Sequence, residues 1–143
     1  MKQYDIAYID FPRNDESVQS GLRPALIFSN DLCNTYSPVI TAIPFTSARK
    51  KQLPTHLYIP ASRQYGLSTD SILLAEQITT VNKKRVQGIV GNVDSAILRE
   101  KIADKVDVQF ARSDKRVIDL LSYLESIGVR SIPEAKQLLM AGA

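Results

Sequence analysis

The chain has 143 residues, of which 44% are hydrophobic and 23% charged, and its formal net charge is +3. This composition is typical of one soluble globular domain and excludes a disordered tail. The chain has a single cysteine, no recognisable signal peptide and no run of ~18 apolar residues, so we expect a cytoplasmic protein without disulfide bonds or membrane association.

The first half of the chain has the pattern of a small β protein. Short runs rich in β-branched and aromatic residues, separated by turn-forming residues, predict strands at Tyr4–Phe11, Pro24–Ser29, Val39–Phe45, Leu53–Ile59 and Ser71–Val81. A long polar loop, Arg13–Leu22, joins the first two strands, and Asn30–Ser37 is expected to form a turn region. Five short strands with regularly spaced turns predict a small antiparallel barrel or coiled sheet.

The periodicity of the apolar residues changes in the second half. Apolar residues recur at every fourth position at Leu98, Ile102, Val106 and Phe110. This spacing predicts a helix over Asp94–Ala111, with Asp94 as its N-cap, that closes over the sheet. Two further helices are expected, one ending at Gly128 and one running from Ser131 to Met140. The predicted architecture is mainly β with C-terminal helices.

The usual catalytic motifs are absent from the sequence. Neither a GxxxxGK[ST] loop nor GxGxxG occurs, and no group of His, Cys and carboxylates has the spacing of a zinc or two-metal site. The only histidine, His56, lies in a predicted strand, so a ribonuclease with a histidine pair is excluded and we interpret His56 as structural. No metal or cofactor is therefore expected, which leaves a binding module or an unusual catalyst.

Positive charge is concentrated between residues 47 and 87. The cations there are Arg49, Lys50, Lys51, Arg63, Lys83, Lys84 and Arg85, against only Asp70 and Glu76. Such a segment can form one face that meets phosphates, or only a solvated surface. RNA carries its own nucleophile, the 2′-hydroxyl, so an enzyme that aligns this group and stabilises the phosphorane needs no metal. An arginine fork and a threonine or serine hydroxyl suit that task.

Several short blocks of the sequence select particular residues for this chemistry. They are Asp5–Ile6, Asp10–Pro12, Gly21–Leu26, Ser29–Asp31, Ile43–Ser47, Leu53–His56, Gly66–Leu67, Asp70–Ser71 and Glu76–Ile78. In their order and spacing, over roughly residues 4–111, they resemble the MazF/PemK family of toxins from bacterial type II toxin–antitoxin systems. Members of that family are sequence-specific endoribonucleases, also called mRNA interferases.

The resemblance implies an SH3-like barrel of the MazF/Kid/CcdB type, a homodimer with an RNA channel across its interface, and a small acidic cognate antitoxin that competes for the channel. It implies metal-independent cleavage of single-stranded RNA by the 2′-hydroxyl, which leaves a 2′,3′-cyclic phosphate and a 5′-hydroxyl. The catalytic roles pass to Arg23 in the G-x-R-P motif, for proton transfer and phosphorane stabilisation, and to Thr46 in the P-x-T motif, for charge stabilisation. The implied RNA-binding residues are Ser17, Gln19, Ser47, Glu76 and Gln77.

The chain also departs from the family pattern. Tyr4 stands where the family often has Gly, and Thr79 stands where it often has Arg. Residues 112–143 extend beyond the end of many members, so we divide the chain into an endoribonuclease domain, 1–111, and a C-terminal helical extension, 112–143. Two alternatives stay open: a CcdB-like toxin of the same fold that poisons gyrase, and a catalytically silent RNA-binding protein. Arg23 could then pair with a surface carboxylate, and Thr46 could be an ordinary turn hydroxyl.

Overall fold

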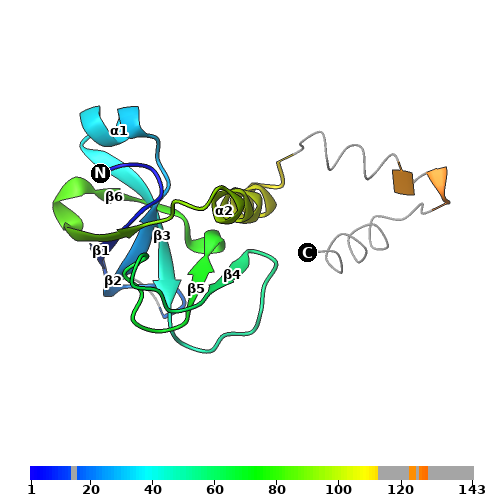
Figure 1. The fold of residues 1–143 in the computed structure, drawn as a ribbon, viewed down its shortest axis with the longest axis horizontal. Coiled ribbons are helices and arrows are strands. Elements are labelled where there is room, and N and C mark those ends of the chain that lie inside the picture. Colours follow the sequence, from blue (N-terminus) through cyan, green and yellow to red (C-terminus); the bar gives the residue numbers. More distant parts are fainter. Residues whose placement is uncertain (14–15, 113–122, 125, 129–143) are drawn as a thin grey trace.

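The computed structural model describes residues 1–13, 16–112, 123–124 and 126–128, which contain a bent antiparallel sheet followed by a helix (Figure 1). The strands are β1 (Asp5–Phe11), β2 (Gly21–Ile27), β3 (Val39–Thr46), β4 (His56–Ile59), β5 (Ser71–Leu74), β6 (Thr79–Asn82) and β7 (Val86–Asn92). The helices are α1 (Asp31–Tyr36) and α2 (Ala96–Phe110), with the 3-10 turns η1 (Ala75–Gln77) and η2 (Lys83–Arg85). The predicted mainly β fold, followed in the chain by a C-terminal helix, is confirmed. The two helices predicted beyond residue 112 lie outside the described residues, except for positions 123–124 and 126–128.

Strand β3 organises the sheet because three other strands pair with different parts of it. One edge of β3 pairs with β2, from Ala25 opposite Pro44 to Ile27 opposite Ala42. Along the other edge, β6 pairs with the first half of β3 and β5 pairs with its last two residues. The strand order is β4-β5-β3-β2-β1-β7, with β6 beside β3, and every pairing is antiparallel. The sheet therefore changes partners along β3, where the C-terminal end of this strand meets β5.

The single strand predicted over Ser71–Val81 is wrong. The chain forms β5, then the η1 turn, and then β6, because these two strands pair with separate parts of β3. The strand β7 was not predicted at all. It contains Gly88 and Gly91 and is mostly exposed, so its sequence shows no apolar alternation, yet it pairs with the edge of β1. Gly91 is required there, since a Cβ at this position would lie 2.3 Å from the backbone of Tyr65.

The turn region predicted over Asn30–Ser37 is also wrong, because it contains helix α1. Asn30 caps this helix by accepting a hydrogen bond from the backbone N–H of Cys33 at 2.8 Å. A helix of six residues is too short to show a helical period in the sequence. The exposed Cys33 thus lies on a helix and not in a turn or in the core.

Helix α2 occupies nearly the predicted range, but its N-cap is Ser95 and not Asp94. The hydroxyl of Ser95 accepts a hydrogen bond from the backbone N–H of Leu98 at 3.2 Å. Ile102 and Val106 are buried as predicted, whereas Phe110 is exposed. In the described part of the chain, no helix has both the length and the apolar character that crossing a membrane requires.

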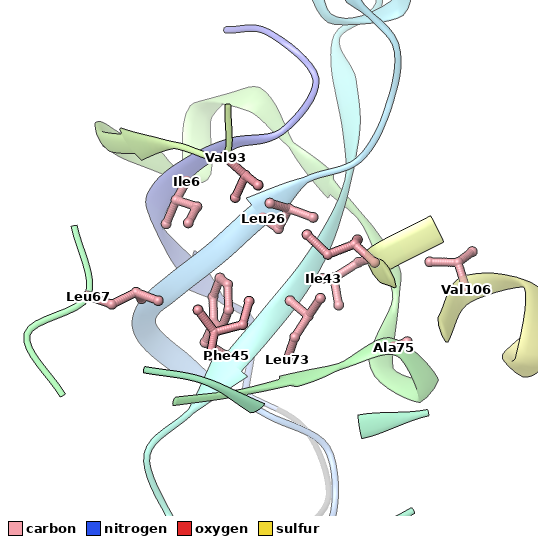
Figure 2. Close-up of a cluster of buried hydrophobic side chains, with 11 residues drawn as sticks. Ile6, Leu26, Ile43, Phe45, Leu67, Leu73, Ala75, Val93 and Val106 are labelled. Atoms are coloured by element: carbon pink, nitrogen blue, oxygen red, sulfur yellow. The ribbon is translucent and has the colours of Figure 1, made fainter. Parts of the chain in front are cut away.

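Two apolar clusters hold the sheet together, one on each face of β1–β3. The larger cluster contains Ile6, Leu26, Ile43, Phe45, Ile59, Leu67, Leu73, Ala75, Val93, Ile102 and Val106. Figure 2 shows that these side chains extend along the sheet from Leu67 on one side to Val106 of α2 on the other. The second cluster contains Ala7, Ile9, Phe11, Ala25, Ile27, Ile40, Ala42 and Val81. Successive strand residues point to opposite faces, and each face of the central strands is covered by one of the two clusters. The central strands are therefore packed on both sides and form a rigid platform.

Candidate active site

A cavity of about 490 Å³ lies across four neighbouring strands of this platform. Its lining residues are Tyr8, Gln19, Leu22, Arg23, Pro24, Phe45, Thr46, Ser47, Ala48, Lys50, Ser68, Thr69 and Ser71. This set contains two cations and six hydroxyl groups but no carboxylate. A cavity of this composition favours an anionic ligand that accepts hydrogen bonds, such as a phosphodiester.

The strand register brings Arg23 and Thr46 together in this cavity. Ala25 lies opposite Pro44 in the pairing of β2 with β3, and the same register continued by two residues sets Arg23 opposite Thr46. Side chains directly opposite each other in an antiparallel pair lie on the same face. Two neighbours of Arg23 fix its backbone. Gly21 adopts φ +78° where β2 begins, and a residue before proline is confined to extended conformations.

Among the described residues, the guanidinium of Arg23 is held by neutral oxygens of the preceding loop. Its Nε and Nη2 donate to the carbonyl oxygen of Ser20 at 3.1 and 2.7 Å, and its Nη1 donates to Oε1 of Gln19. Within the described residues, no carboxylate pairs with Arg23, in contrast to the alternative of an ordinary surface ion pair. Partial burial lowers the pKa of Arg23, although the guanidinium stays charged near neutral pH. The positive charge is thus fixed in place and not neutralised by a described neighbour.

The hydroxyl of Thr46 is buried at the end of β3 and faces the same cavity. Its Oγ1 accepts a hydrogen bond from the backbone N–H of Ala48 at 3.2 Å, which fixes its position. Because a hydroxyl has one donor and two acceptor sites, its proton can still be donated to an oxygen bound in the cavity. The site therefore combines one fixed cation with one oriented hydroxyl donor.

The structure brings some of the predicted RNA-binding residues to the cavity and leaves others outside it. Gln19 and Ser47 line the cavity beside Arg23 and Thr46. Gln77 does not line it but binds the loop that does: its Oε1 accepts from the backbone N–H of Gln19 at 2.7 Å, and its Nε2 donates to the carbonyl of Ser17 at 3.0 Å. The side chain of Ser17 is exposed outside the lining. These placements do not test RNA binding, which stays a prediction for all of these residues.

Glu76 does not line the cavity, and its carboxylate belongs to a separate hydrogen-bonded group. The hydroxyl of Thr55 donates to its Oε2 at 2.7 Å, and Nε2 of His56 donates to its Oε1 at 2.8 Å. The other ring nitrogen of His56 accepts from the backbone N–H of Leu53 at 3.3 Å. Partial burial raises the pKa of Glu76, but hydrogen bonds from Thr55, its own backbone and His56 outweigh that effect and leave the pKa below its ordinary value. These contacts agree with the interpretation of His56 as structural.

Sequence reasoning missed several residues of the cavity. Tyr8 of β1 and the segment with Ser68, Thr69 and Ser71 line it, and of these four residues only Ser71 lies in one of the short sequence blocks, where it was given no role. Of the seven cations between residues 47 and 87, only Lys50 lines the cavity. Arg85 instead donates to the carbonyl of Asp10, so the one basic face suggested by the charge pattern does not form around this cavity. No group of three or more His, Cys, Asp or Glu that could hold a metal occurs within the described ranges.

Similarities to known proteins cover the part of the chain that contains the cavity. The profile of the family described as PemK-like, MazF-like toxin of type II toxin–antitoxin system matches residues 2–110. The sequence is 33% identical over 115 residues to endoribonuclease EndoA of Bacillus subtilis (strain 168), covering 80% of this chain and 97% of that relative.

Two solved structures share the fold at low sequence identity. The first is MazF from Deinococcus radiodurans, with a TM-score of 0.66 and 19% identity, over 78% of this chain and 97% of that one. The second is an endoribonuclease in complex with its cognate antitoxin from Mycobacterial species, with a TM-score of 0.64 and 19% identity, over 80% of this chain and 98% of that one.

Proposed function

The chain belongs to the PemK-like, MazF-like toxins of type II toxin–antitoxin systems, and from this premise we propose that it is an endoribonuclease that uses Arg23 and Thr46 to cleave single-stranded RNA. The observation that carries the proposal is the cavity that is lined by both a fixed guanidinium and a buried hydroxyl and by no carboxylate. A named relative, EndoA, is an endoribonuclease and supports the reaction class. We assign the activity to residues 1–111 and treat 112–143 as an extension.

The proposed reaction is a transesterification within the RNA. The 2′-oxygen forms a bond to the adjacent phosphorus while the bond from phosphorus to the 5′-oxygen breaks. The 2′-hydroxyl loses a proton and the leaving 5′-oxygen gains one, so the products are a 2′,3′-cyclic phosphate and a 5′-hydroxyl. This balance needs no water, oxidant or cofactor.

Arg23 and Thr46 act on the charge that develops in this reaction. The fork of Arg23 donates to the non-bridging phosphorane oxygens, and Thr46 donates a further hydrogen bond from the opposite strand. As the family resemblance implies, we also assign Arg23 a part in the proton transfer, in which its guanidinium donates a hydrogen bond to the leaving 5′-oxygen. Lys50 adds positive charge at the rim of the cavity and attracts the RNA backbone.

The proposed assembly is a homodimer whose RNA channel is blocked by a small acidic antitoxin. The support is the antitoxin complex formed by a protein of the same fold. An acidic segment in the channel would meet Arg23 and Lys50, the cations that we assign to RNA. Antitoxin and RNA should therefore compete in a binding titration, and simultaneous binding without mutual weakening would contradict a shared channel.

The test of the activity is cleavage of a long RNA by the purified chain in excess EDTA. We expect specific cuts that leave 2′,3′-cyclic phosphate ends, and their loss in Arg23→Ala and Thr46→Ala. Arg112→Ala serves as the control, because it removes an exposed arginine at the end of α2, outside the cavity. Absence of cleavage by the unaltered chain, or gyrase-dependent breaks in DNA, would overturn the proposal.

A further inference from the structure

Two irregular segments form the walls of the cavity. The loop before β2 contributes Gln19, whose side chain, together with the carbonyl of Ser20, holds Arg23. The segment between β3 and β4, residues 47–55, contributes Ser47 and Lys50. Because neither segment belongs to a strand or helix, backbone pairing in the sheet does not fix its position. The separation of the two segments therefore depends on hydrogen bonds made outside the sheet.

Both segments are bound to the same short turn, η1. On one side, the amide of Gln77 accepts from the backbone of Gln19 and donates to the backbone of Ser17. On the other side, the carboxylate of Glu76 accepts from the side chains of Thr55 and His56. Adjacent residues of one turn therefore reach the two segments through three hydrogen bonds, and a fourth bond joins Glu76 to His56, the first residue of β4 directly after Thr55.

The turn itself is firmly anchored, as a support of this kind must be. Ala75 is fully buried in the larger apolar cluster, where Figure 2 shows it between the sheet and Val106 of α2. The backbone N–H of Ala75 donates to the carbonyl of Thr55 at 3.2 Å. The strands on either side of η1, β5 and β6, both pair with β3. The turn is thus tied to the strand that carries Thr46.

We propose that Glu76 and Gln77 are positioning residues of the active site, which set its width by holding the two walls. Gln77 holds the loop so that Gln19 and Ser20 orient Arg23, and Glu76 holds the start of β4 and with it the segment that carries Lys50. The inference rests on the proposed function in that the site positioned is the RNA-cleaving one. It assigns Glu76 to the support of the site and not to direct contact with RNA.

This arrangement has a catalytic consequence because Arg23 has a long, flexible side chain. The hydrogen bonds from the loop hold the guanidinium in one position before the RNA binds. Preorganisation of this kind matters because a misplacement of about 1 Å can lower the rate roughly 10²-fold. We therefore expect Gln77→Ala to lower kcat by about 10- to 100-fold, with a smaller effect on KM. Gln87→Ala, on the exposed strand β7, is the matched control.

A double-mutant cycle separates positioning from direct RNA binding by Gln77. Gln77 holds the backbone of the loop, and one of the three contacts that this loop makes with Arg23 comes from the side chain of Gln19, while the carbonyl of Ser20 makes the other two. Gln19→Ala and Gln77→Ala should therefore be less than additive in kcat, and the part of the Gln77→Ala effect that remains should act through Ser20. Gln77→Glu keeps the acceptor for the backbone N–H of Gln19 and should restore part of the rate. Additive losses, or a rise in KM with kcat unchanged, would overturn the positioning role of Gln77.

Hydrogen exchange measured by NMR tests the same proposal without RNA. Gln77→Ala should speed exchange of the Gln19 amide and leave that of Leu53 unchanged, whereas Glu76→Ala should do the reverse. Glu76→Gln can still bond to Thr55 and His56 and should restore protection, and Asp94→Ala, which removes an exposed carboxylate, should change neither amide. This pattern supports the inference even if the unaltered chain fails to cut RNA, a result that would overturn only the proposed function. Unchanged exchange at both amides, with RNA cleavage intact, would overturn the inference alone.

Discussion

Strands β2 and β3 each contain a buried apolar region and a polar end at the cavity. Leu26 and Ile43 face each other in the register and are completely buried. Three residues away along the same two strands, Arg23 and Thr46 present a cation and a hydroxyl to the cavity. The contrast shows that one strand pair serves two purposes, since its middle stabilises the fold and its end arranges the chemistry.

This separation makes the consequences of mutation distinguishable. Buried apolar side chains contribute to the free energy of unfolding, whereas groups aimed at a cavity contribute to the stabilisation of a transition state. Changes in the middle of the strands should lower stability with little effect on the rate per folded molecule. Changes at the cavity should lower the rate per folded molecule with little effect on stability.

The largest effect is expected in the apolar region. Ile43→Ala truncates a fully buried side chain of β3 that belongs to the larger apolar cluster, and it should lower the free energy of unfolding by about 2–5 kcal/mol. Urea unfolding followed by circular dichroism measures this loss. If the variant keeps full stability, the middle of β3 does not carry the core that we describe.

The second effect tests the polar end of the same strand. Thr46→Val keeps the shape of the side chain but removes the hydroxyl, and a hydrogen bond to a charged group is worth about 1.5–3 kcal/mol, so kcat should fall by roughly 10- to 150-fold. Single-turnover RNA cleavage measures the rate. A variant that cuts RNA as fast as the unaltered chain would show that the hydroxyl does not act in the reaction.

The third effect concerns Tyr4, which borders the apolar region and adopts φ +69°. Its ring packs edge-on against Phe28, with centroids 6.0 Å apart, and lies under the guanidinium of Arg99 at 4.8 Å. Removing the ring loses these contacts, but glycine tolerates the left-handed backbone and alanine does not. Tyr4→Gly should therefore be more stable than Tyr4→Ala by about 1 kcal/mol. Equal thermal unfolding midpoints for the two variants would contradict the assignment of strain to this residue.

The smallest effect is the pH dependence that arises from Glu76. Because its pKa is lowered in the folded chain, the ionised carboxylate stabilises the fold above its unfolded pKa of about 4.3, and this stability is lost as the pH falls through the lower folded value. The difference in unfolding free energy between the unaltered chain and Glu76→Gln should therefore shrink as the pH falls below the unfolded pKa and through the lower folded pKa. A difference that stays constant over this range would show that the hydrogen bonds do not favour the ionised form.

The same contrast between the two regions explains what the sequence could predict. Strands β1 and β3 were predicted within a few residues because they are runs rich in β-branched and aromatic residues, and helix α2 was predicted because apolar residues, of which Ile102 and Val106 are buried, recur at every fourth position. The η1 turn was missed because Ala75 is buried like a strand residue, and the need for a break comes from the pairing of β5 and β6 with different parts of β3. That pairing is not visible in a local pattern.

The site was predictable only where a family motif marked it. Arg23 and Thr46 lie in short motifs that the resemblance selected, and the structure brings both to one cavity. Tyr8 of β1 and Ser68 and Thr69 before β5 reach the same cavity from outside these motifs, so only the folded chain places them there. The supporting role that we infer for Glu76 depends on contacts with Thr55, more than twenty positions earlier in the chain, and no local signal indicates them.

The most direct test of the account pairs two measurements on Arg23→Ala: RNA cleavage in EDTA and the free energy of unfolding. The account predicts a loss of about 10²- to 10³-fold in kcat, as expected for the removal of one preorganised donor to a developing oxyanion, with a change in stability of less than about 1 kcal/mol. Cleavage that persists within a few-fold of the unaltered rate would contradict the account, and so would a loss of activity fully explained by unfolding.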